Sequence, residues 1–388
     1  MANTRIYLDW NATAPLMSEA RQAVVEAMDL AGNPSSVHSE GRATRALVEA
    51  ARRRVAALVG AKAENVVFTS SATEAANQVL TPDLRMGKSV LAAGDLYVSA
   101  IEHAAVRMGG RFASARVHEI PVTAGGVVDL SALDVLLAAR PADSGLAMVA
   151  VMLVNNETGV VQPVREAAAI VHARGGLMVC DAVQAVGRLP VDIAALDADF
   201  LLLSAHKIGG PKGAAALVSR GEILMPSALI RGGGQEKGHR GGTENVAAVS
   251  GFGAAAAVAA GDIAERNATI GALRDRLETG MREAAPDVVI HGAAEQRVSN
   301  TCFFTLPGLS SETGQIAFDL EGLALSAGSA CSSGKVGRSH VLSAMGYDPK
   351  AGGLRISLGV STTPEEIDRT VAIFARVAAR RKLAVQAA

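Results

Sequence analysis

The segment DFLLLSAHKIGGPKG, which spans Asp199 to Gly213, places a lysine directly after a short apolar run. The run DFLLL has the length and composition of a buried β-strand, and the Gly/Pro-rich stretch that follows predicts an open turn. Ligands in α/β proteins bind at the carboxyl ends of strands, so Lys207 is expected at the mouth of a binding site. A lysine at a strand end is also commonly a solvated charge, and this segment alone leaves both interpretations open.

A second apolar run, LMVC, ends at Asp181. This carboxylate can pair with a protonated pyridine nitrogen, or it can simply cap the helix that follows. A strand-end lysine that can form a Schiff base, together with such a carboxylate, favours pyridoxal 5′-phosphate (PLP) as a cofactor. Gln184 would reach the ring's phenolic oxygen, and Ser204 and His206 would hydrogen-bond the phosphate.

The string SSATEAAN, residues 70–77, follows the strand candidate NVVFT and begins a helix. Free backbone N–H groups and the helix dipole attract an anion at such a position. Ala72 and Thr73 are therefore the expected phosphate contacts. The alternative is an ordinary helix cap by Ser71 or Thr73.

Extended and helical patterns alternate along most of the chain. Arg42 to Val59 has the periodicity of an amphipathic helix, and strands are predicted at NVVFTS, MVAVMLV, LMVCD, DFLLLSA and AAALVS. Helices that separate such strands imply crossover connections and a mostly parallel sheet. The later strings VSNTCFFTL and GGLRISLG read as strands of a smaller unit.

Several strings together resemble, in their order, the cysteine desulfurases of the NifS/IscS type in the class V aminotransferase group. These strings are IYLDWNATAP, NPSSVHSEGR, FTSSATEAAN, SAIEHAAV, VNNETGVVQP, DAVQAVGRLPVD, SAHKIGGPKG, GGGQEKGHRGGTEN, SAGSACSSG and LRISLG. The resemblance implies an α/β chain of PLP-dependent fold type I. We expect a large PLP-binding domain at 14–258 with a mostly parallel seven-stranded sheet. A smaller α+β domain is expected from 1–13 and 259–388, carrying a catalytic cysteine loop at about 326–339.

The resemblance also implies roles for four further residues. His103 would stack on the PLP ring and act as acid and base, and Asn156 would lie beside the phenolic oxygen and the substrate. Arg355 would clamp the substrate carboxylate, and Thr243 would close the phosphate site of the neighbouring subunit in a homodimer. Without the motifs, His103 could be a structural or surface histidine, Asn156 a turn residue and Arg355 an exposed arginine on a strand.

Cys331 is the expected nucleophile. It lies among small, flexible residues in SAGSACSSG, whereas Cys180 and Cys302 lie in apolar strand candidates and fit a packing role. In the family, the matching thiolate attacks the sulfur of L-cysteine and leaves L-alanine and an enzyme persulfide. A selenocysteine lyase or a class V transaminase on the same fold is the alternative, and a non-catalytic scaffold is a third possibility.

Composition favours a cytoplasmic enzyme with small-molecule chemistry. The formal net charge is −1, so no basic field predicts nucleic-acid or membrane binding, and no apolar run is long enough to span a bilayer. The N-terminus lacks a signal peptide's apolar core. Cysteine and histidine spacing predicts no metal site or disulfide framework. The expected partners are L-cysteine, a second copy of the chain, and an iron–sulfur scaffold or other sulfur-acceptor protein.

Overall fold

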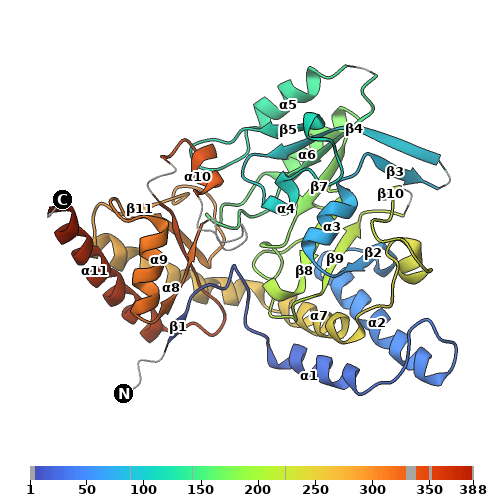
Figure 1. Cartoon of the computed structure of the whole chain (residues 1–388), viewed down its shortest axis with the longest axis horizontal. Coiled ribbons are helices and arrows are strands. Elements are labelled where there is room, and N and C mark those ends of the chain that lie inside the picture. The colour runs from blue at the N-terminus through green and yellow to red at the C-terminus, as the bar shows by residue number, and fades with distance from the viewer. Residues whose placement is uncertain are drawn as a thin grey trace.

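The computed structural model describes residues 5–87, 89–141, 143–222, 224–328, 338–348 and 352–386. Its largest feature is a nine-stranded sheet in the order β10-β3-β4-β6-β7-β8-β9-β2, with β5 paired to β4 (Figure 1). The strands β4, β5, β6, β7 and β8 are parallel to one another, and the flanking pairs are antiparallel. The bounds are β2 Val66–Thr69, β3 Asp83–Met86, β4 Ser89–Ser99, β5 Val117–Ile120, β6 Leu146–Ala150, β7 Leu177–Asp181, β8 Phe200–Ser204, β9 Ala215–Ser219 and β10 Leu224–Pro226.

Both faces of this sheet are covered by other elements. The side chains along a strand accordingly belong in turn to two different apolar clusters. In β8, Leu201 and Leu203 join one cluster, while Phe200 and Leu202 join the other. Successive side chains of a strand point to opposite faces, so a continuous apolar run such as FLLL requires helices on both sides. The helices around this sheet are α1 Ser18–Met28, α2 Ser39–Leu58, α3 Ala72–Val79, α4 Ala104–Arg107, α5 Leu130–Ala138, α6 Val164–Ala173 and α7 Val246–Ala259.

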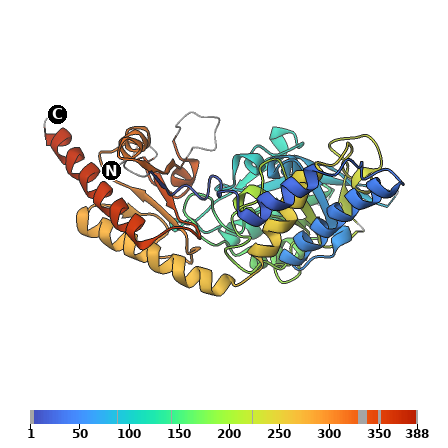
Figure 2. The ribbon, with the colours of Figure 1, turned by 90° about the horizontal axis from the view of Figure 1, so that it is seen from below.

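A smaller antiparallel sheet lies beside the large one, in the order β11-β12-β15-β14. Figure 2 shows the two units side by side, with long helices packed along the smaller sheet. The N-terminal strand β1 (Ile6–Tyr7) belongs to this part of the fold because it pairs with β13 (Leu323–Ala324). The other elements are β11 Val289–Ile290, β12 Thr301–Thr305, β14 Ser326–Ala327, β15 Leu354–Ser357, α8 Ile263–Ala284, α9 Ser311–Leu320, α10 His340–Ala344 and α11 Pro364–Gln386.

The expectation of a large, mostly parallel sheet with a smaller α+β unit is confirmed, but the expected count of seven strands is wrong. The two additional strands are β3 and β10, which extend the sheet in an antiparallel arrangement. β3 has four residues, of which only Leu84 is buried, and β10 has three, so each segment is too short for its sequence pattern to identify a strand. The domain boundaries at 14–258 and 259–388 stay a prediction.

Among the described residues, no single helix is long and apolar enough to cross a membrane. Helices α7 and α8 meet the length and composition requirements only as a pair, and they are bent by 81° at the break between them.

A cluster of charged side chains joins α6 to the residues just before β8 and just after β9. The His172 ring contacts Asp197 Oδ2 through Nδ1 at 3.0 Å and Asp199 Oδ2 through Nε2 at 2.9 Å, while Arg220 binds both carboxylates. Burial alone would lower the pKa of His172, but the hydrogen bonds and charges of Asp199 and Asp197 raise it overall. Both ring nitrogens face carboxylates, so the protonated ring is the form that satisfies the cluster.

This cluster predicts a pH dependence of stability. Because the folded pKa of His172 lies above the unfolded one, its stabilising contribution is complete below the unfolded pKa and is lost as the pH rises through the folded pKa. His172→Gln should therefore lower the free energy of unfolding, measured in urea, more at about pH 5.5 than at about pH 9. An equal difference at both pH values would show that the ring carries no charge in the fold.

Candidate cofactor and substrate site

A cavity of about 560 Å³ opens where the carboxyl ends of β7 and β8 meet the start of α3. This volume lies within the range of ordinary ligand pockets. Nine of the sequence-predicted site residues line it, from segments far apart in the chain. They are Ala72, Thr73, His103, Asn156, Asp181, Gln184, Ser204, His206 and Lys207. Of the remaining predictions, Thr243 and Arg355 are not in its lining, and Cys331 lies outside the described residues.

Lys207 is held at the cavity by the segment that follows β1. It ends the short 3-10 turn η3 (Ala205–Lys207), and its Nζ donates to the carbonyl oxygens of Asn11 at 2.6 Å and Ala12 at 2.8 Å. The chain then turns through Gly209, whose φ of 81° is a left-handed conformation that favours glycine. The expected open turn after the lysine is therefore present, and it leaves the amine at the strand end.

Asp181 ends β7 and is almost fully buried in the cavity wall. Its Oδ1 accepts a hydrogen bond from the Val183 N–H at 2.9 Å. Burial raises the pKa of Asp181, and the Val183 N–H and the charges of His103 and Lys207 oppose that rise. A buried carboxylate is stabilised by a cationic partner, and the protonated nitrogen of a pyridine ring is such a partner. The site therefore suits the ring of PLP.

Glu102, which the sequence analysis did not identify, lies close enough to Asp181 for their charges to interact. Its side chain is completely buried, and its Oε1 accepts the Met152 N–H at 2.6 Å. Burial, and then the charge of Asp181, raise the pKa of Glu102 well above its usual range. Both causes disfavour the charged form of Glu102, which limits the negative charge beside Asp181. Its position next to a candidate histidine in IEH is the one sequence signal that could have indicated it.

The opposite end of the cavity is suited to a phosphate. Helix α3 begins there, capped by Ser71, whose Oγ accepts the Glu74 N–H at 3.1 Å. Lys212 also lines this cavity and adds a cation that the sequence argument had not assigned to the site. Burial, and then the charges of Lys207 and Lys212, lower the pKa of His206 to about 4, so its ring is neutral and can donate one N–H. Helix N–H groups, hydroxyls and a lysine together form a phosphate-binding donor set.

His103 has a defined tautomer at the cavity wall. It precedes α4, and its Nδ1 accepts the Ala105 N–H at 3.1 Å. Because Nδ1 is the acceptor, a neutral His103 carries its proton on Nε2. The side chain can therefore hold or release a proton at Nε2 without losing its helix cap.

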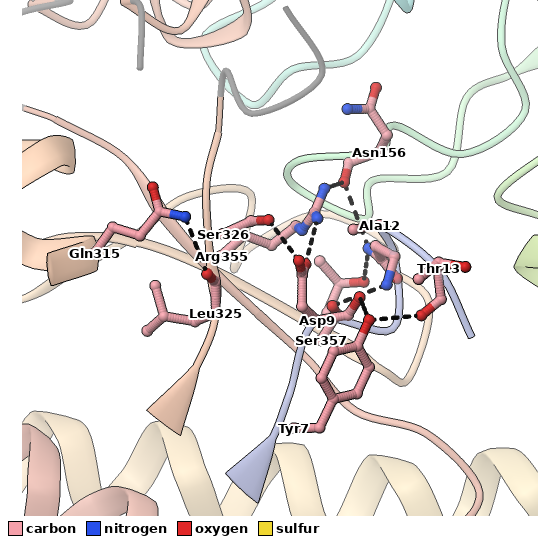
Figure 3. A network of polar contacts seen from close by, with 12 residues as sticks. Tyr7, Asp9, Ala12, Thr13, Asn156, Gln315, Leu325, Ser326, Arg355 and Ser357 are labelled. Carbon is pink, nitrogen blue, oxygen red and sulfur yellow. Dashed lines mark hydrogen bonds and ion pairs between the residues drawn. The ribbon is translucent and has the colours of Figure 1, made fainter. Parts of the chain in front are cut away.

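Arg355 lies on β15 in the network shown in Figure 3 and is fully buried. Its Nη1 donates to the Asn156 carbonyl at 2.8 Å, and its Nη2 donates to Asp9 Oδ1 at 2.8 Å. Asp9 Oδ2 in turn accepts from Ser326 Oγ at 2.8 Å. Among the described residues, Arg355 Nε and Asn156 Oδ1 are buried without a hydrogen-bond partner. Arg355 thus contacts the cavity through Asn156 and already binds one carboxylate, that of Asp9.

Thr243 is exposed and does not line the cavity. The loop that leads to it is anchored to neighbouring helices by two ion pairs. The 3-10 turn η4 (Gln235–Gly238) places Glu236 at a φ of 47°, and its carboxylate forms a two-pronged ion pair with Arg52 of α2 at 2.7 and 2.8 Å. Arg240 of the same loop binds Glu74 of α3 at 3.0 Å. The loop is therefore joined to the helix that begins at the phosphate end of the cavity.

Replacing Arg52 with alanine should destabilise the fold strongly. Glu236 would remain buried without its cation, and breaking one side of a buried ion pair costs about 3–5 kcal/mol. The free energy of unfolding, measured by denaturant titration, should fall by that amount. Glu49→Ala is the matched control, because Glu49 contacts the same arginine at 3.2 Å from a half-buried position. Comparable losses in both variants would contradict the assignment.

The two described cysteines are poor nucleophiles. Cys180 lies inside β7 and Cys302 inside β12, and both side chains are completely buried. Burial raises the pKa of the Cys180 thiol well above its usual range, and burial likewise raises the pKa of Cys302. Neither thiol lines the cavity. The prediction that both are packing residues agrees with this placement.

No group of three or more His, Cys, Asp or Glu side chains in the described part of the chain could hold a metal ion. The cavity instead combines an amine, a buried carboxylate, a histidine and a phosphate-binding end. Its donor set matches an organic phosphate with a ring nitrogen and an aldehyde.

Comparison with known proteins gives a consistent family assignment. Residues 6–370 match the family described as aminotransferase class-V. The chain is 39% identical over 383 residues to a cysteine desulfurase of Cereibacter sphaeroides, with 95% of each chain covered. It is 36% identical to the cysteine desulfurase IscS of Dictyoglomus turgidum, covering 96% of this chain and 94% of the relative. A solved NifS-like protein of Rickettsia africae superposes with a TM-score of 0.86 at 34% identity, covering 96% and 99% of the two chains. SspA in complex with cysteine superposes with a TM-score of 0.72 at 26% identity, covering 92% and 99%.

Proposed function

Because the chain belongs to the class-V aminotransferase family of PLP-dependent enzymes, with cysteine desulfurases as its relatives over nearly the whole length, we propose that it is an L-cysteine desulfurase. The reaction removes sulfur from L-cysteine and yields L-alanine and an enzyme persulfide. The observation that carries this proposal is the single cavity that brings Lys207, Asp181 and His103 together at the ends of the central strands.

The cavity residues divide the work of holding the cofactor. With PLP bound, Asp181 would pair with the ring nitrogen, and Lys207 would supply the amine that reacts with the aldehyde. The N–H groups of Ala72 and Thr73, with Ser204 and His206, would bind the phosphate. When bound, PLP supplies an electron-withdrawing ring that stabilises negative charge at the substrate's Cα.

The substrate is oriented and deprotonated by side chains of the same wall. Arg355 binds the substrate carboxylate, and its partnerless Nε supports this role. The Lys207 amine moves the proton at Cα, and His103 Nε2 holds a proton on the cavity side.

The sulfur step belongs to Cys331. Its thiolate attacks the substrate sulfur, so that an S–S bond forms and the C–S bond breaks. The electron pair of the broken bond goes to the carbon fragment, which takes up a proton and leaves as alanine. The burial of Cys180 and Cys302 supports Cys331 as the nucleophile. We further propose that the persulfide supplies iron–sulfur cluster assembly through a scaffold or another acceptor protein in the cytoplasm.

A homodimer is part of the proposal. Thr243 is exposed and would complete the phosphate site of a second copy. Large apolar side chains are exposed around the same region, including Leu229 and Ile230 in the preceding loop. Met28, Leu30 and Val37 are exposed as well, and exposed apolar side chains favour a protein interface.

One substrate panel tests the proposal. The purified protein is supplied with L-cysteine, L-selenocysteine, or alanine with a 2-oxo acid, in the presence of a reductant. Equimolar alanine and sulfide from L-cysteine are expected. Alanine from selenocysteine alone would support a selenocysteine lyase, and amino-group exchange without sulfide would support a transaminase. Protein that binds no PLP and turns over no substrate would be a non-catalytic scaffold.

Arg355→Ala should raise the KM for L-cysteine by at least about tenfold while cofactor content stays unchanged, because Arg355 is proposed to bind the substrate and does not line the cofactor cavity. Steady-state kinetics and PLP content of the purified variant provide the measurement. Asp9→Asn is the companion variant, because it removes the internal carboxylate from Arg355 and keeps the cation. An unchanged KM in Arg355→Ala would exclude the clamp.

A further inference from the structure

Gln184 lies between two cavities and is held from both ends of its side-chain amide. Its Nε2 donates to the Asn11 carbonyl at 3.0 Å, and its Oε1 accepts from Arg188 Nη1. Arg188 also donates to the Gln184 carbonyl at 2.6 Å. Gln184 lines the main cavity, whereas Arg188 lines a second cavity of about 310 Å³ on the other side.

These partners leave the amide one orientation. The two ends of a glutamine amide are distinguished by their hydrogen-bond partners. A guanidinium has only donors and a backbone carbonyl is only an acceptor, so Oε1 must face Arg188 and Nε2 must face Asn11. One N–H of Nε2 binds Asn11, and the second N–H remains for a ligand in the main cavity.

Arg188 also carries an uncompensated charge. None of the ion pairs among the described residues includes it, and Arg355 is the charged group that affects it most. Burial, and then the charge of Arg355, lower the pKa of Arg188 to about 9, which still leaves it protonated at neutral pH. A partly buried cation without a carboxylate is unfavourable unless an anionic group arrives nearby. The phenolic oxygen of bound PLP is such a group.

We propose that Arg188 is a positioning residue, which fixes Gln184 so that its amide donates to the phenolic oxygen of PLP. This inference rests on the proposed function, because it requires PLP in the main cavity. Arg188 itself need not touch the cofactor. Arg188 affects PLP binding by orienting the Gln184 side chain and by its positive charge. This effect should therefore be seen only with a ligand that carries the phenolic oxygen.

The test compares two ligands on the full chain after the cofactor has been removed. The first ligand is PLP, and the second is the PLP analogue in which hydrogen replaces the phenolic hydroxyl. Arg188→Ala should bind PLP about tenfold more weakly than the wild type, since a charged or oriented hydrogen bond is lost, and should bind the analogue almost as the wild type does. Arg188→Lys keeps the charge but not the fork of donors, so the same selective weakening should be smaller.

Arg266→Ala is the matched control. Arg266 lines the same second cavity, but it donates only to backbone carbonyls at the end of α7. Arg266→Ala should either leave the binding of PLP and the analogue unchanged or weaken the binding of both to the same extent. If the Arg188 variants bind both ligands more weakly to the same extent, or bind both as the wild type does, the inference is overturned and the proposed function is unaffected. A wild-type chain that binds neither ligand would overturn both, and Arg188→Lys provides the comparison if Arg188→Ala does not fold.

Discussion

Lys207→Ala is expected to abolish the covalent attachment of PLP and to reduce L-cysteine turnover by about a thousandfold or more. The amine at the end of β8 is the attachment point and the proton carrier of the proposed reaction, and a positioned acid or base alone accounts for about 10²–10⁴ in rate. Its loss also leaves the Ala12 carbonyl without the Lys207 donor and leaves the Asn11 carbonyl with Gln184 Nε2 alone. Visible absorption of the purified protein and assays of alanine and sulfide provide the measurements.

Lys212→Ala is the control for this variant, because Lys212 lines the same cavity beyond the turn. It should keep the covalent attachment and bind PLP more weakly, since it removes one cation from the phosphate end. Normal turnover in Lys207→Ala would end the assignment of Lys207 and with it the proposed use of PLP.

Cys331→Ala is expected to bind L-cysteine and to release no sulfide under a physiological reductant. The substrate contacts of Lys207 and Arg355 remain, but the acceptor for the sulfur atom is gone. Serine cannot replace it, because attack on sulfur requires a soft nucleophile. Mass spectrometry after a single turnover of the wild type should locate the persulfide on Cys331.

The other two cysteines provide the comparison. Cys180→Ala and Cys302→Ala should keep most of the activity, with a stability loss expected from cavity formation in β7 and β12. Both thiols are completely buried, and burial raises the pKa of each. Persulfide on Cys180 or Cys302, with none on Cys331, would contradict the proposed mechanism.

Much of the cavity could be predicted from local sequence. Each of the runs LMVCD and DFLLLS is apolar, short and followed by a change in composition, and each forms a strand, β7 and β8, where it was expected. Because these two strands are parallel neighbours, Asp181 and Lys207 reach the same edge of the sheet. The start of α3 follows from the same reasoning, since a strand, a serine cap and a helical run are consecutive in the chain.

The interactions that orient the site could not be predicted in this way. Arg355 pairs with Asp9, Arg52 pairs with Glu236, and the Lys207 amine binds the carbonyls that follow β1. Each contact joins segments more than a hundred residues apart, so no local periodicity or spacing signals it. The strands β3 and β10 escape prediction for another reason, because four and three residues are too few for a periodic pattern to identify a strand.

The sequence by itself determined the strands β7 and β8, the start of α3, and the side chains that stand at their ends, since these depend on neighbours within a few residues. Only the tertiary structure decided which of those side chains meet. It placed a carboxylate, that of Asp9, on the arginine expected to bind substrate, and it set a guanidinium behind Gln184. The physical reason is that hydrogen-bond orientation and charge compensation depend on the partners that folding brings within about 3 Å, and those partners come from any part of the chain.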